Sequence, residues 1–143
     1  MFESSGMMEL NYLLERSMDA SSLRSKVIGN NIANVDVPHF KRSEVDFESE
    51  LKRVIDEREE MRQGKFEART TNSLHIPFDE ERGVRSVSPR INLDYSTSYR
   101  SDGNNVDIEK EIVDAQKTSM RYNIAVQSVA QNFKMLKLVM RQV

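Results

Sequence analysis

The stretch that decides the fold is residues 108–143, which read IEKEIVDAQKTSMRYNIAVQSVAQNFKMLKLVMRQV. Apolar side chains recur there in alternating steps of four and three, the heptad spacing of helices that pack lengthwise. The pattern predicts a helix from about Asp107 to Val143, roughly 55 Å long at 1.5 Å per residue. Its apolar seam, interrupted only by Ser119, consists of Ile108, Ile112, Ala115, Tyr122, Val126, Val129, Phe133, Leu136 and Met140.

Charged residues mark both ends of this predicted helix. Acidic side chains stand in its first turns and basic ones near its end, as the helix dipole favours. These are Asp107, Glu109 and Glu111 at the start, and Lys134, Lys137 and Arg141 at the end. We expect Asn104 or Asn105 to cap the first turn.

A second long helix is predicted from about Ser4 to Asn34, where apolar residues also fall three and four apart but less regularly. Serines at 17, 21, 22 and 25 allow a partner helix to approach closely but add little apolar burial. Pro38 ends the helix, because proline excludes the α conformation from the residue before it. We expect the two terminal helices to pair as an antiparallel coiled coil.

The middle of the chain is read as an insert. Residues 43–61 predict a shorter amphipathic helix, and residues 64–104 are rich in glycine, proline and charge, with a brief alternation at Ile91, Leu93 and Tyr95. The predicted fold class is all-α, with short strands in the insert. It has an N-terminal helix over 1–36, an insert over 37–104 and a C-terminal helix over 105–143, the two helical parts forming one discontinuous domain.

Composition argues against several classes of function. Hydrophobic residues make up 38% and charged residues 31%, so a compact monomer would be poorly filled. A net charge of −2 gives no broad basic surface for nucleic acid. No stretch is long and apolar enough to span a membrane, and the N-terminus lacks the pattern of a cleaved signal peptide. We expect neither nucleic-acid binding nor membrane insertion.

Catalytic and metal-binding patterns are absent from the sequence. The chain has no cysteine, and its two histidines, His39 and His75, have no second ligand at metal spacing. No phosphate loop, nucleophile elbow or serine triad can be found. We therefore predict no cofactor, no metal and no enzymatic activity.

The heptad seam allows two interpretations. It could hold the two terminal helices together within one chain, as in a helical hairpin. A two-helix hairpin would still leave apolar side chains uncovered on its outer flanks, so contacts with further chains are expected.

Residues 30–41, NNIANVDVPHFK, resemble the signature of the flagellar rod and hook axial proteins, carried here by Asn30, Asn31, Ile32, Ala33, Asn34, Pro38, Phe40 and Lys41. Asparagine tolerates a left-handed conformation and bonds its own backbone, which suits a helix end. Residues 74–77 and 102–107 are similar to proximal-rod members of that family. Val37 and His39 depart from its usual threonine and glycine. Because histidine adopts positive φ only at a cost, we expect a type I turn here.

The resemblance implies a structural subunit of the proximal rod, assembled helically in the periplasm to transmit torque and surround an export channel. Its implied partners are copies of itself, other rod subunits, inner-membrane ring and rod-adaptor proteins, and the flagellar type III export apparatus. Phe47 and Leu51 are similar to an export motif of such substrates. The alternative is a cytoplasmic coiled-coil adaptor or chaperone in a small closed oligomer, which has no need of the asparagine-rich signature.

Overall fold

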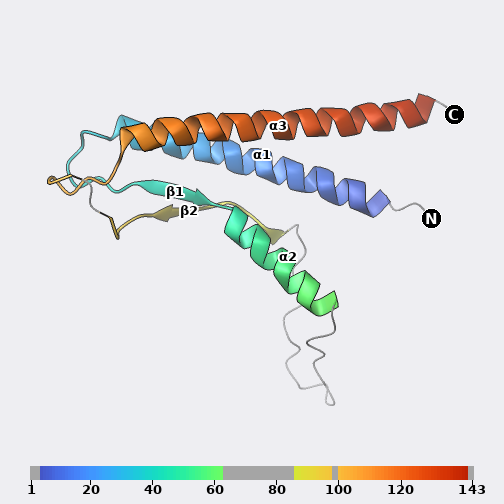
Figure 1. The fold of residues 1–143 in the computed structure, drawn as a ribbon, viewed down its shortest axis with the longest axis horizontal. Helices are drawn as coiled ribbons and strands as arrows, with labels where there is room; N and C mark the ends of the chain where they lie inside the picture. Colours follow the sequence, from blue (N-terminus) through green and yellow to red (C-terminus); the bar gives the residue numbers. More distant parts are fainter. Residues whose placement is uncertain (1–3, 63–85, 98–99, 142–143) are drawn as a thin grey trace, which may run out of the picture.

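Two long helices dominate the molecule (Figure 1). The computed structural model describes residues 4–62, 86–97 and 100–141. Helix α1 spans Ser4–Ala33 and helix α3 spans Ile108–Arg141, and they lie side by side in opposite directions. Between them in sequence come β1 (Ser43–Asp46), α2 (Glu48–Arg62) and β2 (Arg90–Leu93). The predicted helical architecture with paired terminal helices and a small insert is confirmed.

Two side-chain contacts fix the register of α1 against α3. Near the end of α1, Asn31 Nδ2 donates to Glu111 Oε2 over 3.1 Å. Near the start of α1, Asn132 Nδ2 donates to Asn11 Oδ1 over 2.7 Å. Almost equal lengths of the two helices separate these points, so the pair keeps one register along its length.

The side of α3 that is buried against α1 carries small and polar side chains. The buried residues of α3 are Glu111, Thr118 and Ala125, seven residues apart, and those of α1 are Ala20, Ser21, Val27, Ile28 and Asn31. The buried hydroxyls are satisfied within their own helices: Thr118 donates to the Asp114 carbonyl and Ser21 to the Ser17 carbonyl. Of the four serines expected to allow close approach, Ser21 is buried and Ser17 half-buried, whereas Ser22 and Ser25 are exposed.

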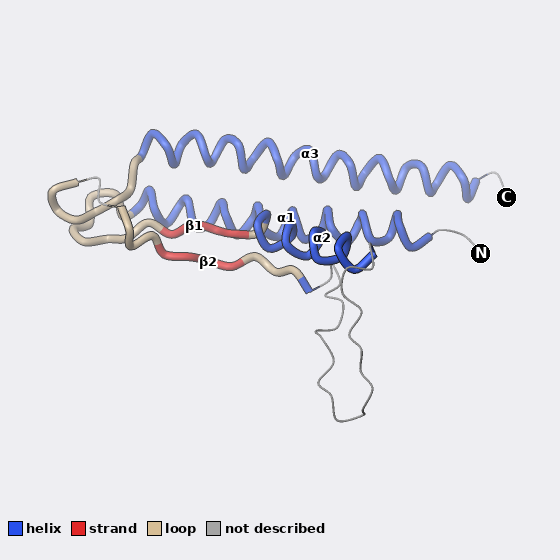
Figure 2. Tube along the Cα trace, turned by 60° about the horizontal axis from the view of Figure 1, so that its bottom comes forward, coloured by secondary structure: helices blue, strands red, loops and turns tan. Residues whose placement is uncertain are grey.

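The insert forms a second layer beside α1. Strand β1 pairs antiparallel with β2, with Val45 opposite Ile91 and Ser43 opposite Leu93. Figures 1 and 2 both show β1 between the helix pair and β2. A small apolar cluster lies where α2 meets α1; it contains Ala20, Phe47, Val54 and Val87, with Leu13 and Leu51 packed against it.

Two predicted element boundaries were wrong. Residues 43–46 form a strand rather than the first turn of the middle helix, because they pair with β2 and bury Val45. Helix α2 begins after them, and Leu51 N donates to Phe47 O in its first turn. The cap of α3 is Asp107, whose Oδ1 accepts from the Glu109 and Lys110 amides, and not Asn104 or Asn105.

The expected type I turn at Pro38 was also wrong. Phe40 N donates to Val37 O, closing a four-residue turn, and His39 at its third position has φ 61°. A type I turn requires negative φ there, whereas type II requires a positive value. The His39 amide donates to Asp102 O over 3.1 Å, so the neighbouring loop holds this conformation.

Candidate functional site

A buried set of polar side chains joins the two helices to the insert at one end of the molecule. We call it the polar junction and define it as Asn31, Arg42, Asn104, Asn105 and Glu111. All five are buried, with Asn31, Asn104 and Glu111 fully enclosed. They come from the end of α1, the approach to β1, the loop before α3 and the first turn of α3, so four separate segments meet there.

An ion pair between Glu111 and Arg42 lies at the centre of the junction. Arg42 Nε donates to Glu111 Oε1 over 2.5 Å, and the other carboxylate oxygen accepts from Asn31. The two side chains are 0% and 8% exposed. Burial disfavours the charged form of Arg42, but its hydrogen bond to Glu111 outweighs this, so the pKa of the guanidinium is raised above its usual value.

Asn104 caps the carbonyl end of α1 from outside the helix. Its Nδ2 lies 3.1, 3.0 and 2.8 Å from the carbonyl oxygens of Asn34, Val35 and Val37. Its Oδ1 accepts from the Val106 amide, which leads into α3. Carbonyls past a helix end need such partners, and here one side chain supplies them while also positioning the start of α3.

Asn105 ties the insert to the same point. Its Oδ1 accepts from the Arg42 amide over 2.6 Å, and its Nδ2 donates to Asp94 O over 2.8 Å. The Asp94 carboxylate in turn accepts from Thr97 and Ser96, which lowers its pKa from the usual 3.8 to about 2. The loop after β2 is therefore fixed relative to β1 and α3.

Side chains of α1 occupy the inner edge of β1. Asn31 Nδ2 donates to Ser43 O over 2.8 Å and its Oδ1 accepts from Ser43 N over 3.0 Å. One amide side chain thus copies the paired bonds of a neighbouring strand. Further along, Arg24 Nη2 donates to Val45 O over 3.1 Å. The sheet cannot extend in this direction.

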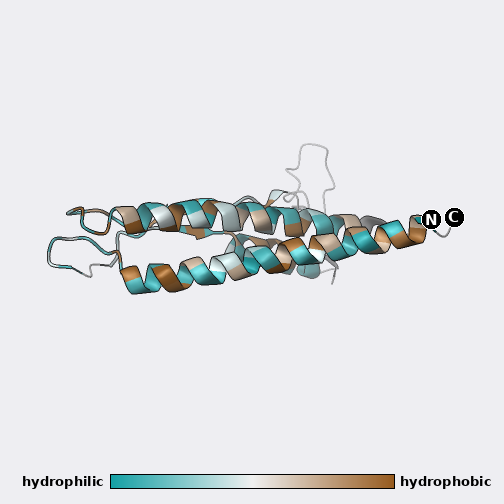
Figure 3. Cartoon of the chain, turned by 90° about the horizontal axis from the view of Figure 1, so that it is seen from above, coloured by the Kyte–Doolittle hydropathy of each residue, from teal (hydrophilic) through white to brown (hydrophobic). Residues whose placement is uncertain are grey.

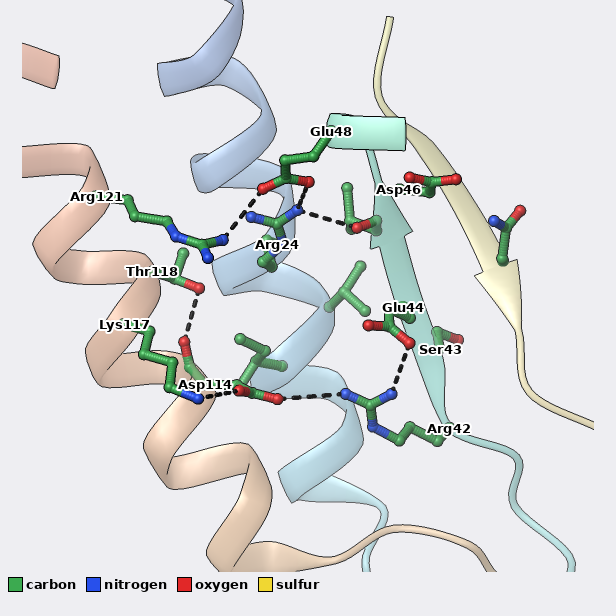
Figure 4. A pocket seen from close by; sticks show the side chains of 14 residues that line it. Arg24, Arg42, Ser43, Glu44, Asp46, Glu48, Asp114, Lys117, Thr118 and Arg121 are labelled. Carbon is green, nitrogen blue, oxygen red and sulfur yellow. Dashed lines mark hydrogen bonds and ion pairs between the residues drawn. The ribbon is translucent and has the colours of Figure 1, made fainter. Parts of the chain in front are cut away.

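A hollow of about 540 Å³ lies between α1, β1 and α3 (Figure 4). Two chains of ion pairs cross it: Arg24 and Arg121 both contact Glu48, and Arg42 and Lys117 both contact Asp114. Burial disfavours ionised Glu48, but the hydrogen bond from Arg24 outweighs this and lowers its pKa. Because these cations already have acidic partners, the ion pairs hold the surrounding elements together and leave no cation of the two chains unpaired for an anion.

The heptad seam of α3 faces mostly outward. Seven of its nine residues are exposed, with Ala115 and Val129 half-buried. Phe133 is 60% exposed, and further apolar side chains outside the seam, such as Ile124 and Leu138, are exposed too. Figure 3 shows apolar residues recurring along both helices. The contact with α1 uses a different heptad position, that of Glu111, Thr118 and Ala125.

The structure places the other predicted site residues as follows. Asn31 belongs to the junction, and Lys41 Nζ reaches its rim by donating to Gly103 O over 2.9 Å. Asn34 Nδ2 donates to Asn30 O within the last turn of α1. Ile32, Ala33, Pro38 and Phe40 belong to the helix end and the turn after it. Phe47 is 3% exposed and packs with Leu51 in the apolar cluster.

Sequence reasoning missed Arg42 and Glu111, and it gave Asn104 and Asn105 the wrong role. No sequence signal marked Glu111, because the stripe that it shares with Thr118 and Ala125 is recognisable only once the helix pair is known. His75 and residues 74–77 lie outside the described residues. Within the described ranges no cluster of possible metal ligands occurs, and none of the described helices could cross a membrane.

The paired antiparallel terminal helices and the asparagine-rich turn at one end fit the axial proteins of the flagellar rod and hook that residues 30–41 resemble. No protein-family model matches the chain. Flagellar basal body rod protein FlgB of Borrelia hermsii is 38% identical over 129 residues, covering 90% of this chain and 93% of the relative. FlgB of Borreliella burgdorferi is 33% identical over 128 residues, covering 88% and 91%.

FlgB of Bacillus subtilis is 30% identical over 127 residues, covering 89% of each chain. The chain belongs to the FlgB family of flagellar basal body rod proteins.

Proposed function

We propose that this chain is a structural subunit of the proximal part of the flagellar basal-body rod. Copies would repeat along a helix, transmit torque and surround a channel for exported proteins. The observation that carries the proposal is the outward row of apolar residues on α3, that is, the seam from Ile108 to Met140. The residues that α3 buries internally are instead Glu111, Thr118 and Ala125. An exposed apolar row of this length is a surface for other chains.

The row runs almost the whole length of α3, from Ile108 to Met140. A contact at a single point would leave most of this row exposed, whereas lengthwise packing against helices of neighbouring subunits would bury it. Contacts between different surfaces of identical subunits generate helical assemblies. We therefore assign Ile108, Ile112, Ala115, Tyr122, Val126, Val129, Phe133, Leu136 and Met140 to packing between subunits.

The polar junction gives such a subunit a fixed shape. Torque can pass through a protein only if its helices do not slide, and buried hydrogen-bonded ion pairs favour a single register. Arg42, Asn31 and Glu111 hold α1, β1 and α3 at one point. The asparagine signature then serves as the joint that connects the end of α1 to the insert and sets the direction in which the chain leaves the helix.

The proposed partners are further copies of this chain, other rod subunits, inner-membrane ring and rod-adaptor proteins, and the flagellar type III export apparatus. Membership of a basal body rod family supports assembly with rod components in general. We propose Phe47 and Leu51 as an export motif that is readable only before folding, since both pack in the apolar cluster of the folded chain. A purely structural role without catalysis stays a prediction.

The proposal is tested by charging the exposed row without touching the fold. Phe133→Asp places a carboxylate on a side chain that is 60% exposed in the single chain, so helicity should be retained while rods fail to form. Gln131→Asp puts the same charge on an exposed polar position of the same helix and should leave rods intact. Motility and basal bodies counted by electron microscopy are the readouts. Normal rods with Phe133→Asp would overturn the proposal.

A further inference from the structure

Among the described residues, nothing pairs with the outer edge of β2. Asp94 N donates to Arg42 O, which sets the alternation of the β1 to β2 ladder: Arg90, Asn92 and Asp94 turn their backbone groups toward β1. The backbone groups of Ile91 and Leu93 therefore point away from the sheet. No described residue bonds to them. Figures 1 and 2 show that this edge faces away from α1 and α3.

The two edges of this sheet differ in whether their backbone groups have hydrogen-bond partners. Asn31 and Arg24 seal the inner edge of β1 with side-chain hydrogen bonds. On β2, by contrast, Ile91 and Leu93 are 53% and 51% exposed, and their outward backbone groups have no hydrogen-bond partner among the described residues. Proteins usually protect such an edge with lysine, proline or an inward charge, because it templates pairing with another strand. A two-stranded sheet also gains stability from further strands.

The sequence of β2 is complementary to itself in one antiparallel register. With Asn92 on a two-fold axis, Ile91 of one copy stands opposite Leu93 of the other, and these are the residues whose backbone groups face outward. The same register puts Arg90 opposite Asp94, a pairing of unlike charges across strands. Asp94 is ionised under ordinary conditions, since its pKa is about 2.

We propose that two copies of this chain pair antiparallel through β2, with the axis at Asn92, forming a four-stranded sheet across the dimer. The isologous pair is closed, unlike the repeated contacts of a polar rod, so it forms between subunits that are outside the rod. It leaves the apolar row of α3 uncovered. The dimer thus goes beyond the rod function.

The absence of cysteine from the chain allows a direct test. Antiparallel residues opposite each other in a non-hydrogen-bonded pair have Cα atoms about 4.5 Å apart, which is within the range of a disulfide. In the full-length chain, Asn92→Cys should therefore cross-link to its counterpart under mild oxidation. Ser88→Cys is the matched control, because it is exposed on the same segment yet lies about 27 Å from its counterpart in this register.

The expected result is at least about tenfold more dimer with Asn92→Cys than with Ser88→Cys, because only the first pair falls within disulfide reach. Adding Leu93→Pro should remove this difference, since proline deletes an outward donor without breaking the β1 ladder. Circular dichroism checks that this variant stays folded. Equal cross-linking at 92 and 88, or cross-linking unchanged by Leu93→Pro, would overturn the proposal. Either failure leaves the rod function standing, because that rests on α3 and is tested by Phe133→Asp.

Discussion

Glu111 in the first turn of α3 and Arg42 ahead of β1 form a buried ion pair, with Nε and Oε1 2.5 Å apart. The residues are 69 positions apart in the sequence. Both charges have lost most of their water, and they are stable there because Asn31, Glu44 and Asp114 supply further partners. The start of α3 is thereby placed against the end of α1 and the beginning of the insert.

Removing one charge of this pair should be costly. Glu111→Gln removes the carboxylate at Arg42 Nε while Glu44 and Asp114 still contact the guanidinium, so we expect a loss of about 1.5–3 kcal/mol in the free energy of unfolding. Glu109→Gln, an exposed change in the same turn, should cost far less. Urea unfolding of the purified chain, followed by circular dichroism, measures both. Equal stability of the two variants would show that the pair does not hold the junction.

Asn104→Ala should loosen the end of α1. The change removes the donor to three carbonyls and the acceptor for Val106 N. Leaving buried backbone groups without partners costs about 1–3 kcal/mol. Asn34→Ala, which loses only bonds to Asn30, is the control and should have a smaller effect. Hydrogen exchange of the Val35 and Val37 amides would reveal the loosening, and unchanged protection in Asn104→Ala would contradict the capping role.

Two glycine substitutions should change the stability of the folded chain in opposite directions. Gly103 has φ +80°, and a Cβ there would meet His39 Nδ1 at 2.9 Å, so Gly103→Ala should destabilise the turn. Gly29 lies inside α1 with nothing within 4 Å of a new Cβ. Gly29→Ala should therefore stabilise the chain by about 0.5–1 kcal/mol. Thermal unfolding compares them, and a stabilising Gly103→Ala would mean that the loop at Asp102 does not hold the His39 turn.

Much of this architecture could be predicted from the sequence. Both helices follow from apolar spacing, and α1 ends near Asn34 because Pro38 follows. Strand β1 could not be foreseen, because residues 43–46 read SEVD and carry only one apolar side chain. Its conformation depends on β2 and on Asn31, both distant in sequence. The intrinsic conformational preferences of residues 43–46 therefore could not predict the strand.

The junction was only half predictable. The signature identified Asn31 and Lys41, but Glu111 lay among helix-dipole charges that ordinarily face water. It is buried because Arg42 reaches it from another segment. Likewise the seam followed from heptad spacing, whereas the internal contact through Glu111, Thr118 and Ala125 has no apolar pattern to predict it. Helices that pair through small and polar residues leave little trace in hydropathy.

Acid should release the turn after β2 only at low pH. Hydrogen bonds from Thr97 and Ser96 to the Asp94 carboxylate lower its pKa from 3.8 to about 2. Because the folded-state pKa is depressed, this contribution is fully present above about pH 4 and is lost as the pH falls through the folded value. Carboxyl chemical shifts across this range measure it by NMR. A midpoint near 3.8 would contradict the hydrogen-bonded turn.

A charge on the internal face of α3 should act differently from one on the outer row. Ala125 is buried against α1, so Ala125→Asp should unfold the helix pair by burying an unpaired carboxylate, at a cost of several kcal/mol. Phe133→Asp should retain helicity and lose only assembly. Circular dichroism separates the two variants. Equal loss of helicity would mean that Phe133 already supports the fold of the single chain.

The central claim is that the outward row of α3 is buried between subunits of the rod. Electron cryomicroscopy of basal bodies purified from cells carrying this chain tests it most directly, because density at side-chain level shows what covers each helix. The account predicts α1 and α3 paired as in the single chain, with Phe133 and Leu136 enclosed by helices of neighbouring subunits. A rod in which this row faces open solvent, or which lacks the chain altogether, would contradict it.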